Sequence, residues 1–167
     1  NDRFIFKDDK YLLGKTDNKS NIFDKFLFAR RDIKNVIIPS NIRIISAHAF
    51  YYCQKLEKIE FESNSNLLTI GNAAFLHTSI KEITIPSGIS KIFEFTFFDC
   101  KKLKRIKFSP NSKLQTIDRY AFSDSNINEI CIPSSVSIIS KYSFSECQRL
   151  QIIEISDGSN LQVLSKY

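Results

Sequence analysis

Cysteine and histidine are the residues of this chain best suited to redox, metal or nucleophilic chemistry. The chain has four cysteines and two histidines among 167 residues, and three of the cysteines recur every 47 residues: Cys53, Cys100 and Cys147. His48 and His77 have no cysteine or carboxylate at the spacing of zinc ligands, and they complete no Ser-His-Asp or Cys-His set. There is no glycine-rich phosphate loop. The sequence therefore predicts no enzyme, no metal site and no cofactor.

Positive charge is concentrated in one short run, from residue 101 to residue 107, in a chain with a formal net charge of +6. Leu103 and Ile106 within the run occupy core positions of the repeat described below, so we interpret the run as a solvated turn and strand start. A weak site for acidic glycans or for an acidic protein patch is the alternative. No nucleic-acid motif accompanies the run, so no nucleic-acid partner is expected. The chain lacks a run of about 18 apolar residues, so direct membrane insertion of this segment is not expected.

The interval between the cysteines belongs to an internal repeat. The segment Ile33–Ser40, which reads IKNVIIPS, returns at Ile80–Ser87 and at Ile127–Ser134. Each 47-residue block divides into two units of 23 and 24 residues, and the six units begin at Ile33, Leu56, Ile80, Leu103, Ile127 and Leu150. Consecutive units of one length are the signature of a repeat architecture.

Each unit combines a strand with a more tightly wound segment. Apolar residues at positions 1, 4 and 6 alternate with polar residues at positions 3 and 5, which is typical of a strand that ends at Pro or at a Ser/Asn turn. The spacing that follows, as in Ile70, Ala74 and Phe75, predicts a short helical or 3₁₀ segment. Such a unit cannot bury its apolar face alone, but stacked copies can. We therefore predict an α/β-type solenoid with a parallel sheet on the concave face and the helical or 3₁₀ segments on the convex face.

The ends of the chain depart from the repeat. Residues 1–32 are predicted to form a degenerate first repeat, with Phe28 as the equivalent of Phe75 and a capping hairpin over residues 4–13 that covers the first edge of the sheet. Residues 33–167 are predicted to form a solenoid of six units, the last incomplete. Either the native chain continues beyond Tyr167, or this end packs on a partner.

The cysteine column is predicted to be packing rather than a set of disulfides. Cys53, Cys100 and Cys147 are separated by units that carry Thr78 and Ser125 at the same position. Two strand spacings amount to about 9–10 Å, whereas a disulfide needs Cα atoms within about 7 Å. Cys131 is expected to be an exposed thiol on the concave face, so the cysteines do not indicate the redox compartment.

Positions 3 and 5 of the strands are predicted to point outward from the concave sheet and to bind a protein partner. These positions are Asn35, Ile37, Lys58, Glu60, Glu82, Thr84, Arg105, Lys107, Glu129, Cys131, Ile152 and Glu154. Four of them form a ladder of alternating sign, which is either charge pairing that keeps the sheet soluble or a platform for a partner: Lys58, Glu82, Arg105 and Glu129. Ile37 and Ile152 are expected to be apolar anchors, unless flanking segments cover them.

The repeat resembles a known family. The pattern Leu-x-x-Ile-x-Ile-Pro-x-x-Val-x-x-Ile-x-x-x-Ala-Phe-x-x-Cys is matched almost throughout by Ile127–Cys147, with Ser143 in place of Ala. It is similar to the BspA-like leucine-rich repeat family, also called the Treponema pallidum type, over about residues 20–167. The resemblance implies 23–24-residue leucine-rich repeats in a large surface or secreted protein, because members are typically of that kind and several are thought to attach to host proteins.

Three functions are compatible with these observations. The first is a non-enzymatic binding module of a cell-surface or secreted protein, in which the concave sheet mediates adhesion to an extracellular-matrix or host-cell protein. The second is a structural spacer, or a solenoid that associates end to end. The third is an intracellular interaction scaffold, which unpaired cysteines favour. A glycosylation sequon at Asn18 would matter only on a secretory route.

Overall fold

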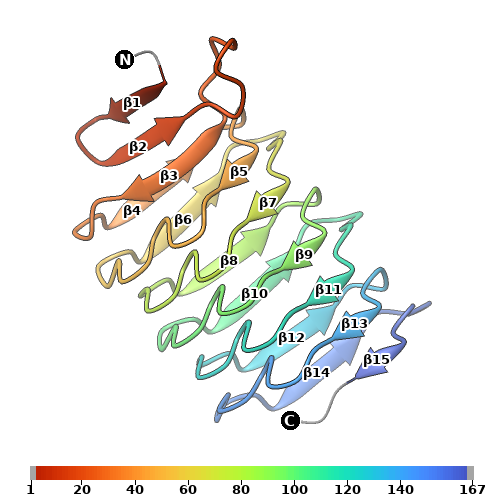
Figure 1. Cartoon of the computed structure of the whole chain (residues 1–167). Helices are drawn as coiled ribbons and strands as arrows, with labels where there is room; N and C mark the ends of the chain where they lie inside the picture. The colour runs from red at the N-terminus through yellow and green to blue at the C-terminus, as the bar shows by residue number, and fades with distance from the viewer. Residues whose placement is uncertain (1–2, 165–167) are drawn as a thin grey trace.

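Two kinds of strand make up each turn of the chain in the computed structural model, which describes residues 3–164 (Figure 1). Four-residue strands recur at the start of successive units: β4 (Asn35–Ile38), β6 (Lys58–Phe61), β8 (Glu82–Ile85), β10 (Arg105–Phe108), β12 (Glu129–Ile132) and β14 (Ile152–Ile155). Two-residue strands follow them: β5 (Ile44–Ile45), β7 (Thr69–Ile70), β9 (Lys91–Ile92), β11 (Thr116–Ile117), β13 (Ile138–Ile139) and β15 (Val163–Leu164). Three strands precede the repeats: β1 (Phe4–Lys7), β2 (Tyr11–Gly14) and β3 (Lys25–Ala29).

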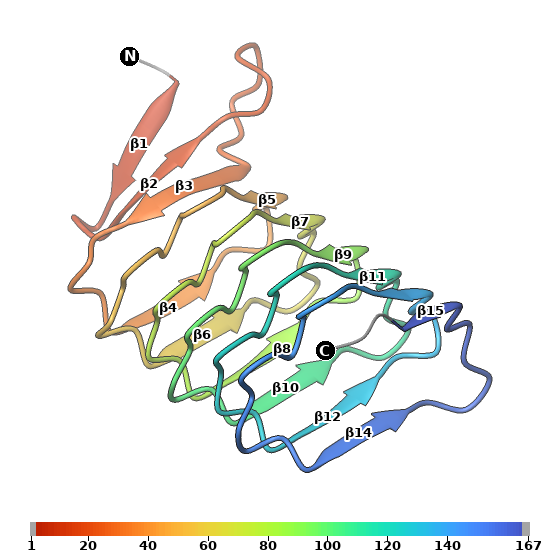
Figure 2. The same ribbon diagram turned by 60° about the horizontal axis from the view of Figure 1, so that its bottom comes forward.

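The units stack as coils of a solenoid, with all repeat strands parallel (Figures 1 and 2). The long strands form a pair, β4 with β6, and a sheet of four in the order β8, β10, β12, β14. Between the two, the Lys81 amide donates a hydrogen bond to the Glu57 carbonyl oxygen at 3.3 Å. The short strands form a second wall, in which β9, β11, β13 and β15 are paired in order. The predicted parallel-sheet solenoid is confirmed.

Alternation of apolar and polar residues explains the long strands. In β8 and β12 the pattern of burial is exposed, buried, exposed, buried, so the isoleucines point inward and the intervening polar side chains point outward. In β6 and β10 the last residue is a phenylalanine, Phe61 or Phe108, and it is half-buried. The inward residues of one coil therefore lie directly against those of the next.

The convex segments are not helices. Among the described residues no helix is present, and each convex segment is a series of turns with two residues in the left-handed region, such as Phe95 (φ 57°) and Asp99 (φ 54°). The amide of Phe98 donates to the carbonyl oxygen of Phe95 within its coil at 3.1 Å, whereas that of Phe97 donates to Ala121 in the next coil at 2.8 Å. A helix would keep all of these bonds within the segment. The expected helical or 3₁₀ segments are therefore not confirmed.

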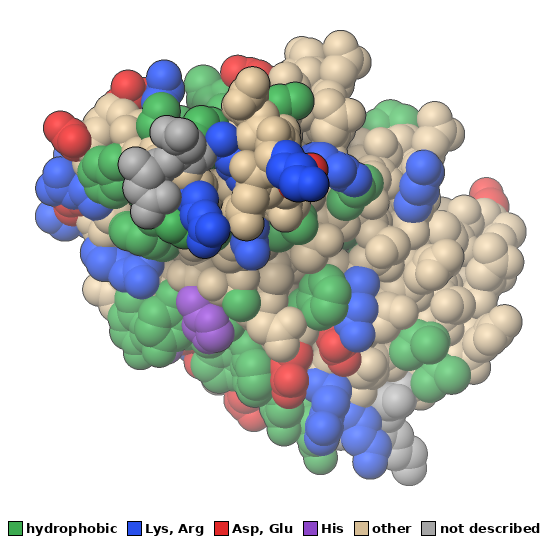
Figure 3. Space-filling model, turned by 45° about the horizontal axis from the view of Figure 1, so that its top comes forward, with side chains coloured by type: hydrophobic (Ala, Val, Ile, Leu, Met, Phe, Trp, Pro, Cys, Tyr) green, Lys and Arg blue, Asp and Glu red, His purple; other side chains and the backbone are tan. Residues whose placement is uncertain are grey.

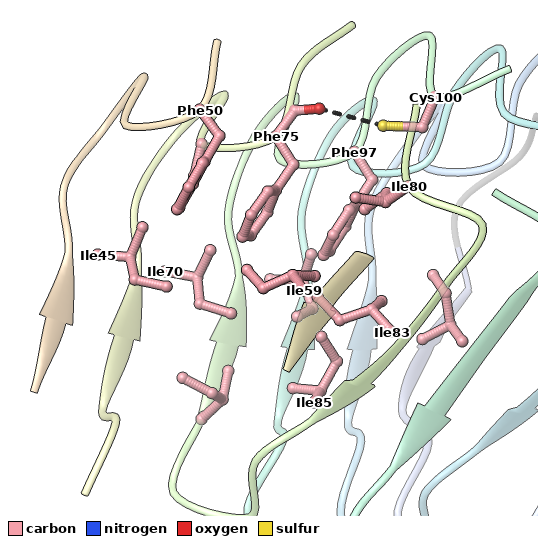
Figure 4. Close-up of a cluster of buried hydrophobic side chains, with 14 of the residues drawn as sticks. Ile45, Phe50, Ile59, Ile70, Phe75, Ile80, Ile83, Ile85, Phe97 and Cys100 are labelled. Atoms are coloured by element: carbon pink, nitrogen blue, oxygen red, sulfur yellow. Dashed lines mark hydrogen bonds between the residues drawn. The ribbon is translucent and has the colours of Figure 1, made fainter. Parts of the chain in front are cut away.

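A ladder of phenylalanine rings fills the interior (Figure 4). Phe50, Phe75, Phe97 and Phe122 are fully buried, and consecutive ring centroids lie 5.1, 5.3 and 5.4 Å apart with nearly parallel planes. Phe144 continues the ladder at 5.3 Å from Phe122. Each ring buries large apolar area against the coil before it and the coil after it, so adjacent coils hold each other in register.

The N-terminal hairpin lies on the short-strand wall. β1 and β2 are antiparallel, β2 pairs with β3, and β3 runs parallel to β5 (Figure 2). The hairpin therefore does not pair with β4, which was the expected sheet edge. Phe26 rather than Phe28 joins the ring ladder, 4.7 Å from Phe50, because the pairing of β2 and β3 shifts register beside Leu12 and Leu13. The division at residue 32 stays a prediction, and the last three positions of the incomplete sixth unit lie outside the described residues.

Candidate functional site

The outward side chains of the long strands form one continuous surface, which we call the long-strand face. All twelve residues predicted for partner binding lie on it, and all are exposed: Asn35, Ile37, Lys58, Glu60, Glu82, Thr84, Arg105, Lys107, Glu129, Cys131, Ile152 and Glu154. Because successive side chains of a strand alternate between faces, the two outward positions of each strand are brought to the same side. Their role in binding stays a prediction.

Strand pairing sets these side chains in two rows. Arg105 lies opposite Glu82 on one side and Glu129 on the other, and Glu129 lies opposite Ile152. In the second row Lys107 lies opposite Thr84. Further pairs complete the rows at the two ends: Asn35 with Lys58, Ile37 with Glu60, and Cys131 with Glu154. The predicted alternation of sign along the first row is therefore present in the register.

The ion pairs differ from those that the ladder would suggest. Lys58 Nζ lies 2.9 Å from Glu60 Oε1, a residue of its own strand, and not against Glu82. Within residues 3–164, no ion pair joins Arg105 to the carboxylate on either side of it. Direct ion pairs between neighbouring strands therefore do not hold the outward ladder among these residues. The side chain of Arg105 is exposed between two carboxylates.

The middle of the long-strand face is hollowed. An open hollow of about 1280 Å³ lies over β6, β8 and β10 and over the turns that follow β6 and β8. Seven of the predicted residues line it: Asn35, Lys58, Glu60, Glu82, Thr84, Arg105 and Lys107. The rest lie toward the two ends of the face. The sheet is therefore concave where the central coils meet.

Residues at position 2 of the units also line the hollow, and they are not among the twelve residues predicted for partner binding. Glu57, Lys81 and Lys104 occupy this position in three successive coils, and Lys81 Nζ lies 2.7 Å from Glu57 Oε2. The hydrogen bond and the charge of Lys81 lower the pKa of the Glu57 carboxyl, and the charges of Lys102 and Lys34 add to the effect. These residues could have been identified from the sequence, because position 2 recurs with the same period as positions 3 and 5.

The cysteine column has a polar role in addition to packing. Cys100 Sγ donates to the carbonyl oxygen of Phe75 in the preceding coil at 3.1 Å and lies 3.4 Å from Thr78 Oγ1 (Figure 4). Cys147 makes the equivalent bond to Phe122 at 3.1 Å. Burial raises the pKa of the Cys100 thiol to about 12. The column thiols are thus neutral donors that link one coil to the next, while Cys131 is free and exposed.

An aromatic band runs along the convex turns. Ring centroids are 4.3 Å apart for Tyr52 and His77, and 5.2 Å apart both for Phe95 and Tyr120 and for Tyr120 and Tyr142. Figure 3 shows hydrophobic side chains gathered around a histidine on the visible face. The last three rings stack within 13° of parallel, so they cover each other's faces and present their edges to solvent. This band was not predicted from the sequence.

From residue 3 to residue 164 no group of three or more His, Cys, Asp or Glu side chains is placed to hold a metal ion. His77 pairs with Asp99, whose carboxylate lies 3.2 Å from Lys101 Nζ, so these groups bind each other. Over the same residues the backbone forms no helix that could cross a membrane.

Comparison with known proteins identifies the repeat. The pattern of the BspA type leucine rich repeat region matches residues 21–151 in six copies. No curated protein matches the sequence.

Solved structures of bacterial repeat proteins share the fold. The pneumococcal vaccine antigen PcpA is 28% identical with a TM-score of 0.68, and the similarity covers 75% of this chain and 31% of PcpA. A leucine-rich repeat protein from Bacteroides ovatus is 25% identical with a TM-score of 0.68, over 90% of this chain and 39% of that protein. The leucine-rich repeat protein of T. pallidum, 22% identical, has a TM-score of 0.70 over 87% of this chain and 69% of its own. The chain thus spans about a third of PcpA.

Proposed function

The chain belongs to the BspA-type leucine-rich repeat family, and on that premise we propose that it is a non-enzymatic protein-binding module whose contact surface is the long-strand face. The observation that carries the proposal is the hollow over β6, β8 and β10, which is lined by exposed charged and polar side chains. Solenoids of this kind present extended concave surfaces to their partners. A rigid row of outward side chains offers many contacts without the entropic cost of ordering a loop.

A location at the cell surface, and adhesion to an extracellular-matrix or host-cell protein, are part of the same proposal. They are supported by the similarity to PcpA, which is described as a pneumococcal vaccine antigen. The surface chemistry agrees with reversible binding, because the exposed side chains of the hollow are charged or polar and do not form the apolar centre of an obligate interface.

Surface plasmon resonance with one blocking variant tests the proposal. The purified chain is passed over immobilised extracellular-matrix and host-cell proteins, and any saturable partner is tested against Thr84→Trp. Thr84 is exposed at the centre of the face, so an indole there should obstruct contact and weaken binding by about tenfold or more. Ser90→Trp, at an exposed position beside the short strand β9, is the matched control. A partner that binds Thr84→Trp and the wild type equally well would show that the face is not the contact surface.

End-to-end association is a second candidate, favoured by the exposed apolar side chains of the last coil. In β14 Ile152, Ile153 and Ile155 are 48%, 38% and 44% exposed, and Leu164 in β15 is 57% exposed. A strand edge with such side chains can pair with a further repeat of the same protein or with another chain. Light scattering over a range of concentrations should show a rising mass for the wild type and a constant mass for Ile153→Lys. A constant monomer mass for the wild type would remove this candidate.

A further inference from the structure

The bases on and beside β10 form no ion pair with another side chain among residues 3–164. Lys104, Arg105 and Lys107 line the hollow, and none of them has a carboxylate within ion-pair distance among residues 3–164. The other two bases of the hollow are engaged, Lys58 with Glu60 and Lys81 with Glu57. The bases without an ion pair are therefore concentrated at β10 and at the residue just before it.

A basic rim at the start of the long strands extends this charge. The backbone amide of Lys81 donates to Glu57 and that of Lys104 donates to Lys81, at 3.3 and 2.9 Å, so these side chains lie side by side in successive coils. Lys102 is exposed in the turn just before. Glu57 is the only acidic side chain at position 2 of the described units, and Lys81 already neutralises it.

The apolar side chains that line the hollow are not exposed, because Phe61 is half-buried and Ile59 and Ile83 are buried. The exposed large apolar side chains of the long-strand face, Ile37 and Ile152, lie on β4 and β14, away from its centre. The backbone of β8 and β10 is already paired within the sheet, so a partner cannot add a strand there. Contact in the hollow therefore depends on side-chain charge and hydrogen bonds.

We infer that the hollow binds an acidic segment of a protein partner, with its carboxylates placed against Arg105 and Lys107 and with Lys104 at the rim. This inference rests on the proposed function and specifies the chemistry of the partner. Arg105 and Lys107 project from the same side of β10, two residues apart, so they can receive two carboxylates of one extended segment. Arg105 provides a planar, bidentate partner and Lys107 a point charge.

The flanking carboxylates favour an acidic protein segment over a densely charged polyanion. Glu82 and Glu129 lie on either side of Arg105 in the register. A chain with an anion at every step would meet both of these carboxylates and be repelled. A peptide can place neutral or basic residues opposite them and its acidic residues opposite the bases.

Fluorescence anisotropy with two labelled probes tests the inference. One probe is a short peptide in which Glu alternates with Ser, and the other has Gln in place of Glu. The test variant is Arg105→Glu/Lys107→Glu, and its matched control is Arg119→Glu/Lys141→Glu, which reverses one Arg and one Lys on exposed convex positions. Circular dichroism establishes that each variant is folded.

The Glu peptide should bind the wild type and the Arg119→Glu/Lys141→Glu control within about twofold of one another, and the test variant at least about tenfold more weakly. The Gln peptide should not bind. Binding should weaken as salt is raised toward 0.15 M, where the Debye length is about 8 Å.

Three results would overturn the inference. The first is that the Glu peptide does not bind at low salt, and the second is that Arg119→Glu/Lys141→Glu loses as much affinity for it as the test variant does. The third is that a sulfated heparin fragment binds through Arg105 and Lys107 while the Glu peptide does not bind. The last result would assign the site to polyanions. None of these results bears on Thr84→Trp, so the proposed function is judged separately.

Discussion

Removal of a single ring from the interior ladder should destabilise the solenoid strongly. Phe97 is fully buried, and its centroid lies 5.3 Å from that of Phe75 and 5.4 Å from that of Phe122. Truncation of a buried phenylalanine to alanine costs about 3–5 kcal/mol. Stacked pairs contribute about 0.5–1.5 kcal/mol each beyond buried area, and Phe97 takes part in two. Phe97→Ala should therefore lie at the upper end of the range, at about 4–5 kcal/mol.

Phe144→Ala provides the comparison, because Phe144 stacks on Phe122 and has no further ring beyond it among the described residues. Phe144 is 4% exposed, so it buries nearly as much area as Phe97 but makes one stacked contact instead of two. Its truncation should cost about 3 kcal/mol. Urea denaturation followed by far-ultraviolet circular dichroism measures both variants, and an unchanged m-value would show that the folded and unfolded states are comparable.

A loss below about 2 kcal/mol for Phe97→Ala would refute this reasoning, because it would fall under the range for buried phenylalanines. A larger loss for Phe144→Ala than for Phe97→Ala would also refute it, because the order follows from the number of stacked neighbours. A variant that unfolds in two transitions would instead show that the coils on either side of Phe97 had become uncoupled, as nearest-neighbour stability allows.

Three further predictions concern titratable groups. Because burial raises the pKa of Cys100 from 9.0 to about 12, its contribution to stability should be complete below pH 9 and decline as pH rises toward 12. Urea titrations at about pH 8.5 and 10.5 should therefore show a smaller alkaline loss for Cys100→Ala than for the wild type, and equal losses would contradict the assignment. Cys131 should react with Ellman's reagent in the folded protein, whereas Cys100 should react only after unfolding; similar rates for the two would show that the coils open readily. Burial alone would raise the pKa of the Asp24 carboxyl, but hydrogen bonds from the hydroxyl and the amide of Thr16 outweigh this effect and hold the pKa below 3.8. The stability that this contact contributes should therefore be lost as pH falls through the acid range. Thr16→Val should lose less stability than the wild type between neutral and acid pH in the same assay. A dependence of stability on pH equal to that of the wild type would show that this contact is not the cause of the acid loss.

The repeat, the parallel sheet and the outward residues were predictable from the sequence. A strand has a side-chain period of two, so isoleucines at positions 4 and 6, such as Ile83 and Ile85, must point inward together and Glu82 and Thr84 must point outward. Units of nearly constant length then bring equivalent positions into register. This is why the twelve candidate residues share one face, although their function is not decided by that placement.

The convex segments and the contacts of the site depended on tertiary structure. Ala121 and Phe122 follow the preceding apolar residues at a spacing that suits a helix, but the amide of Phe97 donates its hydrogen bond to Ala121 in the next coil. A local sequence pattern carries no information about a hydrogen-bond partner in another coil. The same holds for the hairpin, which pairs through β3 with the short-strand wall, and for the bond from the Cys100 thiol to Phe75.

The charged side chains show most clearly what the sequence determines and what depends on the tertiary structure. The sequence by itself determined that Lys58, Glu82 and Arg105 follow one another in a row, because the repeat sets their register. Only the tertiary structure decided that Lys58 turns to Glu60 in its own strand, while Arg105 forms no ion pair with any described residue. The physical reason is that side-chain torsions choose among several carboxylates at similar distances, and that choice depends on all neighbouring coils at once.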